Sequence, residues 1–196
     1  MTSNRAGDRF MRNNDAQEAM KRLREVKIKR EIVFSGKMLT MCVDAVKLPN
    51  GREATREVVL HPGAVAMLAI TEQDEALLVS QLRYALDQVT LELPAGKLEP
   101  EENPDDAAFR ELAEETGYRA SGLKRVLEFY TAAGFSDEKI YLYEATGLKK
   151  GEQHLDEDET IDLVALRRDE VRQMIDRGQI TDAKTLIGLF WWLGRP

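Results

Sequence analysis

The chain has 196 residues, of which 43% are hydrophobic and 32% charged, a composition typical of a folded globular protein. The net charge of −7 argues against a nucleic-acid-binding surface, and the apolar runs are too short to span a bilayer. The polar stretch 1–14 does not resemble a signal peptide, and the single cysteine, Cys42, cannot form an internal disulfide. We therefore expect a cytoplasmic protein that binds neither nucleic acid nor membrane.

The N-terminal part of the chain divides into a charged segment and a strand-rich one. Residues 1–25 carry many charges of both signs, which predicts a frayed tail or a short solvated helix. Apolar residues then predict strands at 32–34, 38–47 and 58–60, with a hairpin turn at 48–51. Such a small antiparallel sheet buries little surface, so we expect residues 26–61 to pack on something else.

Residues 62–196 are predicted to form one domain in which strands and helices follow each other in mixed order. This order favours an α/β sandwich built on a mixed sheet. We expect strands at 64–70, 76–82, 89–93, 123–130, 139–143 and 161–165, and helices at 104–116, 169–177 and 182–193.

The helix predicted at 104–116 begins after Asn103, a good N-cap residue, and ends before Gly117. Glu111, Glu114 and Glu115 are three and four residues apart and share one face of this helix. Apolar or small side chains that we expect to face the core lie on the other side, namely Phe109, Leu112 and Thr116.

Two interpretations of the three glutamates follow from the residues alone. Glutamates on a helix usually form a solvated face. However, like charges four residues apart destabilise a helix, and no lysine lies on that face to compensate. A hard cation such as magnesium would turn this repulsion into ligation. The two histidines, His61 and His154, are too isolated to suggest a zinc site.

A longer motif surrounds these glutamates. It runs as G-x5-E-x7-R-E-U-x-E-E-x-G-U, where U is a bulky apolar residue, and its fixed positions are Gly96, Glu102, Arg110, Glu111, Leu112, Glu114, Glu115, Gly117 and Tyr118. The chain thereby resembles the Nudix hydrolases. Further matching segments between residues 32 and 193, such as 92–99 and 182–185, resemble the ADP-ribose pyrophosphatase branch of that family.

The resemblance implies a Nudix-type α/β/α sandwich with a mixed sheet, plus a small N-terminal antiparallel β-sheet. In this branch that sheet exchanges with a second subunit, so a homodimer is expected. The implied reaction is metal-dependent hydrolysis of a small nucleoside diphosphate substrate, with ADP-ribose giving AMP and ribose 5-phosphate. The implied cofactor is Mg²⁺, for which Mn²⁺ can substitute.

The resemblance also assigns metal ligands and catalytic residues. Glu111 and Glu115 correspond to the central magnesium ligands, Glu114 to a third, and the backbone carbonyl of Ala95 to a further one. Arg110 belongs to the catalytic motif, where pairing with Glu102 to hold the loop to the helix is the favoured role over chemistry.

The general base and the substrate-binding residues lie outside the motif. Glu159 matches a glutamate on a mobile loop that acts as base in this branch. The alternatives are that 156–159 is only a solvated acidic loop, and that Glu114 is the base. Arg56 and Arg83 match positions that contact substrate, a task that suits a planar guanidinium. Glu92 is a weaker candidate for substrate or metal binding. Simple surface solvation is the alternative for each arginine.

Ala133 departs from the pattern, because members that act on ADP-ribose commonly carry a proline at this position. An alternative substrate is therefore another nucleoside diphosphate sugar. A third hypothesis is a Nudix domain that senses ADP-ribose without cleaving it. The intact motif and the lack of a basic recognition helix argue against this sensor.

Overall fold

The computed structural model describes residues 13–155 and 159–195. The chain divides into two compact units, Met1–Leu60 and His61–Pro196. The first part of the charged N-terminal segment and the acidic residues at 156–158 lie outside the described residues. Within the described part of the chain, no helix is long and apolar enough to cross a membrane.

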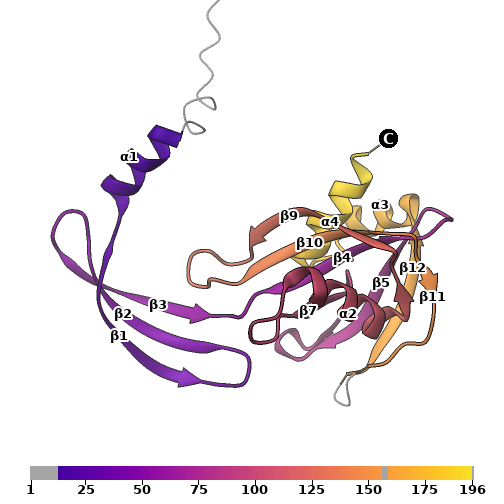
Figure 1. The fold of residues 1–196 in the computed structure, drawn as a ribbon, viewed down its shortest axis with the longest axis horizontal. Helices are drawn as coiled ribbons and strands as arrows, with labels where there is room; N and C mark the ends of the chain where they lie inside the picture. Colours follow the sequence, from indigo (N-terminus) through magenta and orange to yellow (C-terminus); the bar gives the residue numbers. More distant parts are fainter. Residues whose placement is uncertain (1–12, 156–158, 196) are drawn as a thin grey trace, which may run out of the picture. The chain divides into compact units, whose positions relative to one another are not determined.

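The first unit contains one helix and a three-stranded antiparallel sheet (Figure 1). The strands lie in the order β1-β2-β3, and the predicted turn between the last two is present, with Gly51 N–H donating to the Leu48 carbonyl at 2.9 Å. The small N-terminal sheet is thus confirmed. The elements are α1 (Asn13–Leu23), β1 (Val26–Ser35), β2 (Thr40–Lys47) and β3 (Glu53–Leu60).

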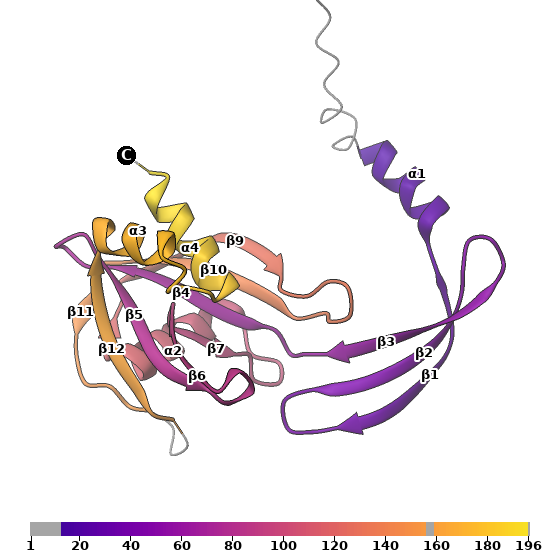
Figure 2. The ribbon, with the colours of Figure 1, turned by 180° about the vertical axis from the view of Figure 1, so that it is seen from behind.

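A seven-stranded sheet forms the centre of the second unit (Figure 2). Five strands follow the order β12-β5-β4-β10-β9, while β6 pairs with β5 and β7 pairs with β4. Since β4 and β10 run parallel and the other pairs antiparallel, the sheet is mixed, as predicted. The strands are β4 (Ala64–Ile70), β5 (Glu75–Arg83), β6 (Gln88–Glu92), β7 (Ala95–Lys97), β9 (Gly122–Tyr130), β10 (Lys139–Thr146) and β12 (Ile161–Arg167).

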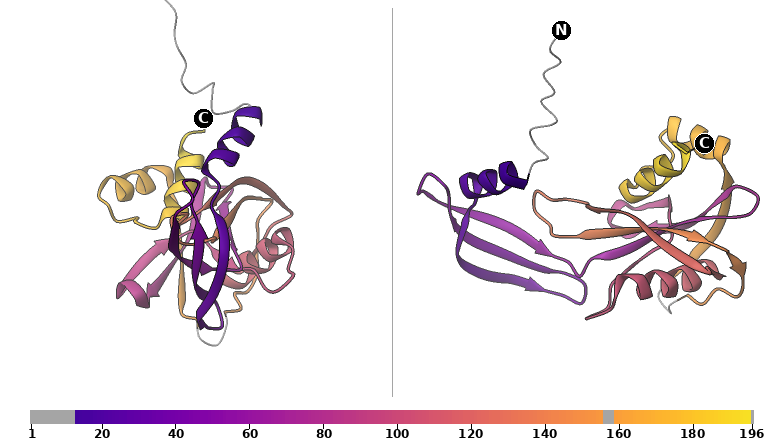
Figure 3. Two further views of the ribbon diagram at one scale, coloured as in Figure 1. Left: turned by 90° about the vertical axis from the view of Figure 1, so that its left-hand side faces the viewer. Right: turned by 45° about the horizontal axis from the view of Figure 1, so that its top comes forward.

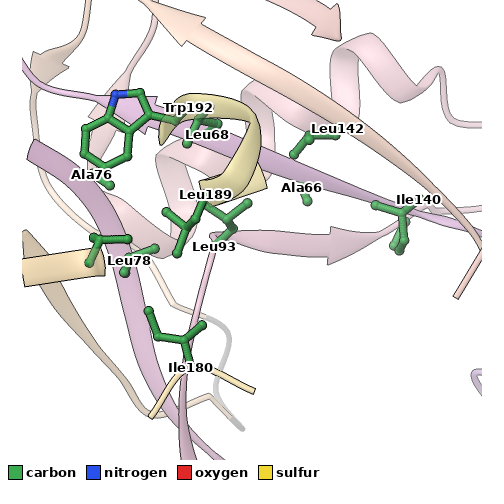
Figure 4. Packing of buried hydrophobic residues seen from close by; sticks show 12 residues of the cluster. Ala66, Leu68, Ala76, Leu78, Leu93, Ile140, Leu142, Ile180, Leu189 and Trp192 are labelled. Carbon is green, nitrogen blue, oxygen red and sulfur yellow. The ribbon is translucent and has the colours of Figure 1, made fainter. Parts of the chain in front are cut away.

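Helices cover both faces of this sheet (Figure 3), which confirms the α/β/α sandwich. Alternate residues of β4 point to opposite faces, so Val65 and Met67 pack with α2, while Ala66 and Leu68 pack with α3 and α4 (Figure 4). The remaining elements are α2 (Pro104–Thr116), α3 (Arg168–Asp176), α4 (Ala183–Leu193), the 3₁₀ helix η2 (Tyr84–Leu86), and the short paired strands β8 (Tyr118–Arg119) and β11 (Lys149–Lys150).

Two sequence predictions differ from this structure. Phe109 was expected to face the core, but it is 42% exposed, because Ala107, Ala108 and Leu112 form the packed stripe of α2. Strand β7 was not predicted, since three residues that include a glycine carry no alternating pattern. Its pairing with β4 fixes the backbone of Ala95 next to α2.

Candidate active site

The residues that flank helix α2 cap it at both ends. Asn103 Oδ1 accepts a hydrogen bond from Asp105 N–H at 2.9 Å, as expected for an N-cap. Gly117 ends the helix in the left-handed conformation, and a Cβ there would lie 2.9 Å from the backbone nitrogen of Gln153. The helix that carries the glutamates is therefore fixed at both ends.

Glu115 is the most buried carboxylate of α2, with 3% of its surface exposed. Its Oε2 accepts a hydrogen bond from Ala95 N–H at 2.8 Å. Burial raises the pKa of Glu115 to about 8, and the charges of Glu111 and Glu159 act in the same direction. The Ala95 hydrogen bond and the charge of Arg83 lower this pKa but do not offset the burial. Such a site favours either a proton or a metal cation on Glu115.

Glu111, one turn before Glu115 on α2, places its carboxylate against Gly96, the neighbour of Ala95. A Cβ at Gly96 would lie 1.8 Å from the Glu111 carboxyl carbon, so only glycine leaves room for this side chain. Burial raises the pKa of Glu111 as well, and the charges of Glu114 and Glu159 contribute. The missing side chain at Gly96 of β7 thus leaves the space that the Glu111 carboxylate fills.

Arg110 pairs with Glu102, and it also places a cation beside the glutamates of α2. Its guanidinium donates to both carboxylate oxygens of Glu102 at 2.9 and 3.0 Å. The same group also donates to Glu111 at 2.7 Å and to Glu114 at 2.9 Å. Arg110 therefore ties the preceding loop to α2 and partly neutralises the glutamate face.

Glu159 lies in a cleft of about 400 Å³ whose lining also includes Arg83 and Lys97. Its charge raises the pKa values of Glu111 and Glu115, as noted above, so the three carboxylates share one electrostatic environment. The structure thus brings together the predicted base, one predicted substrate-binding arginine and two predicted metal ligands.

Glu92 lies 2% exposed at the end of β6 and accepts several hydrogen bonds. Arg83 donates to both of its carboxylate oxygens at 2.7 Å, Thr90 donates at 2.7 Å, and Lys184 donates from the start of α4. Burial opposes ionisation, but the hydrogen bonds from Arg83 and the charge of Lys184 outweigh it and hold the pKa of Glu92 at about 2. Glu92 therefore holds Arg83 in place.

One predicted residue belongs to the other unit, and two lysines were not predicted. Arg56 belongs to the first unit, where it donates to Glu25 at 3.0 Å. Lys97 and Lys184 were not singled out in the sequence. The sequence held a signal for Lys184, because a lysine in the first turn of a helix opposes the helix dipole. Such a lysine indicates that an acidic partner lies near it.

The donor set suits a hard divalent cation, since it consists of carboxylates and the Ala95 carbonyl. Among the described residues, no group of three or more acidic, histidine or cysteine side chains is already gathered around one point. Arg110 donates to one oxygen of Glu111 and to one oxygen of Glu114. A metal ion would use the second oxygen of each carboxylate while Arg110 keeps its hydrogen bonds.

Comparison with known proteins connects this geometry to a family. The model of the NUDIX domain matches residues 60–187, which include the whole glutamate motif and Glu159. The chain belongs to the Nudix family. This Nudix hydrolase is 42% identical over 168 residues to the ADP-ribose pyrophosphatase of Bacillus subtilis (strain 168), covering 85% of this chain and 91% of that protein. The expected relationship to that branch is confirmed.

Two further similarities extend the comparison. The hydrolase is 47% identical over 167 residues to the methanol dehydrogenase activator of Bacillus methanolicus, covering 84% of this chain and 90% of that protein. A solved structure described as an ADP compounds hydrolase superimposes with a TM-score of 0.77 at 22% identity, covering 87% of this chain and 95% of that one. The likeness to this solved structure supports the α/β/α sandwich described above.

Proposed function

We propose that this Nudix hydrolase cleaves the diphosphate linkage of ADP-ribose to AMP and ribose 5-phosphate. The observation that carries the proposal is the grouping of Glu111, Glu115 and Glu159 beside Arg83, in a chain related to ADP-ribose pyrophosphatases. Burial and neighbouring carboxylates raise the pKa values of Glu111 and Glu115, and such carboxylates suit metal-assisted attack on a diphosphate.

Magnesium, or manganese in its place, would be held by Glu111, Glu114, Glu115 and the carbonyl of Ala95. When bound, the metal neutralises the diphosphate and polarises the attacked phosphorus. The 2.8 Å hydrogen bond from Ala95 N–H holds the Glu115 carboxylate against the backbone of Ala95, and Arg110 holds the loop against the helix. Both contacts would keep the ligand set in place before substrate binds.

Glu159 is our candidate for the base that accepts the proton of the attacking water. It shares its cleft with Arg83, whose planar guanidinium can donate to phosphate oxygens, and with Lys97. Glu92 would hold Arg83 through its two hydrogen bonds. We keep Arg56 as a further candidate for substrate contact.

We also propose a homodimer formed through residues 26–61, in the cytoplasm. Strand β1 is an edge strand, and Val26, Ile28, Ile32 and Phe34 on it are each more than half exposed, at 56, 52, 62 and 56%. An unpaired edge with this much apolar surface is a place where a second copy of the chain can bind.

A panel of nucleotide sugars tests the substrate. Purified protein with magnesium is incubated with ADP-ribose, UDP-glucose and GDP-mannose, and the release of nucleoside monophosphate is followed. We expect the highest kcat/KM for ADP-ribose, and Glu115→Gln serves as the inactive control. A higher kcat/KM for another nucleotide sugar would establish the alternative substrate class instead, and tight binding of ADP-ribose without turnover would identify a sensor.

A second candidate function is activation of a methanol dehydrogenase, favoured by the 47% identity to the Bacillus methanolicus activator. The test adds the protein to the purified methanol dehydrogenase of that organism and measures alcohol oxidation. Glu115→Gln again serves as the comparison, since an activation that depends on hydrolysis should disappear with it.

A further inference from the structure

Lys184 stands at the start of α4, where its charge opposes the helix dipole. Only 11% of its side chain is exposed. Its ammonium group forms ion pairs with Glu92 and, at 3.1 Å, with Asp182, the N-cap residue of the same helix. A buried lysine at this helix start is therefore stabilised by its two acidic partners, of which Glu92 is the more buried.

Through Glu92, this lysine is one contact away from Arg83. The Glu92 carboxylate lies between the two cations and accepts from both. The Arg83 side chain is 41% exposed, and it lines the cleft that contains Glu159 as well as a neighbouring cavity of about 470 Å³ that Lys184 also lines. Arg83 is thus fixed on its buried side and open on the other.

The same helix start also holds the backbone that follows Glu92. Leu93 N–H donates to Thr185 Oγ1 at 2.8 Å, and that hydroxyl donates to Asp182 at 2.6 Å. A Cβ at Gly188 would lie 2.5 Å from a Leu93 methyl carbon, so the helix and this segment are in close contact. Two residues further on, Ala95 meets Glu115.

We propose that Lys184 is a positioning residue for substrate binding, which fixes the Glu92 carboxylate and thereby orients Arg83 toward the diphosphate of the substrate. The inference rests on the proposed function. Lys184 matches the negative charge of Glu92, so the positive charge of Arg83 remains available for phosphate oxygens. Without Lys184, Arg83 would have to match the charge of Glu92, and its hold on the phosphate oxygens of the substrate would weaken.

The test compares K184M and K184R with wild type under magnesium and ADP-ribose. We expect K184M to raise KM by about tenfold or more while kcat stays within about threefold, because the lost contact acts on ground-state binding. K184R keeps a cation near Glu92, so its KM should return to within about threefold of wild type. K139M is the matched control, since Lys139 forms an ion pair with Glu128 on β9 and lines neither cavity.

An unchanged KM in K184M, or an equal rise in K139M, would overturn the proposal. A rise in KM that K184R fails to reverse would also overturn it, because the fold rather than the charge would then be responsible. Should K184M not fold, K184Q takes its place in the same measurement. This variant removes the charge, while its amide can still donate to Glu92. If wild type itself releases no nucleotide from the panel, the proposed function fails, which is a separate result.

Discussion

The glycine at position 96 lies directly against the carboxylate of Glu111, such that a Cβ there would fall 1.8 Å from the carboxyl carbon. We therefore expect Gly96→Ala to displace Glu111 from the Ala95 side of the site. A shift of about 1 Å in a catalytic group can cost about 10²-fold in rate, and we expect a loss of kcat/KM of that order. Gly134→Ala is the control, because a Cβ at Gly134 meets nothing within 4 Å. Equal activity of both variants would contradict the assigned site.

Glu115→Gln should abolish metal-dependent hydrolysis, with turnover falling by at least about 10²-fold at limiting magnesium. Gln is nearly as good a helix former as Glu, so α2 should still form. Calorimetric titration with Mg²⁺ should show weaker binding to the variant. Asp106→Asn on the exposed first turn of α2 is the matched control. Wild-type turnover in Glu115→Gln would show that the metal site lies elsewhere.

Glu159→Gln should lower kcat by about 10²–10⁴-fold with KM within a few-fold, because a general base acts only as the proton leaves water. Steady-state kinetics with saturating magnesium measure both constants. Glu157→Gln, two residues earlier in the chain, is the control. If Glu157→Gln is damaging and Glu159→Gln silent, the base was assigned to the wrong residue. If both are silent, Glu114 becomes the candidate.

Stability toward acid should depend on Glu92. Its pKa in the folded protein is about 2, below the ordinary 4.5, so its ionised form stabilises the fold above pH 4.5. This stabilisation, on the order of 3 kcal/mol, should be lost as pH falls from about 4.5 toward 2. In urea denaturation, the difference in free energy of unfolding between wild type and Glu92→Gln should shrink as the pH is lowered through this window. Glu72→Gln in the exposed turn after β4 should keep a constant difference from wild type.

The dimer prediction concerns residues 26–61. Removal of residues 1–20 should leave a dimer in analytical ultracentrifugation at micromolar concentration, because that segment has no strong apolar stripe. Replacing Ile32 and Phe34 of β1, which are 62 and 56% exposed, with Lys should shift the protein toward monomer. A fully active wild-type monomer would contradict the dimer.

Much of the fold was predictable because periodic patterns mark elements by local physics. The alternation in β4 and the N-cap and end glycine of α2 are each encoded within a few residues. The three glutamates of the motif likewise lie on one helix, so their spacing alone predicted a shared face. Short strand β7 was not predicted, because only its pairing with β4 makes it a strand. The exposure of Phe109 was not predicted either, because the packing of α2 decides which of its side chains are buried.

The sequence by itself determined the family and the helix that carries the carboxylates, and it predicted which residues would bind metal. Only the tertiary structure decided that Glu115 is buried against Ala95, that Gly96 makes room for Glu111, and that Lys184 reaches Glu92 across 92 residues of chain. Burial and the charges of distant residues set the pKa of a carboxylate, and both depend on which segments meet when the sheet and its helices assemble.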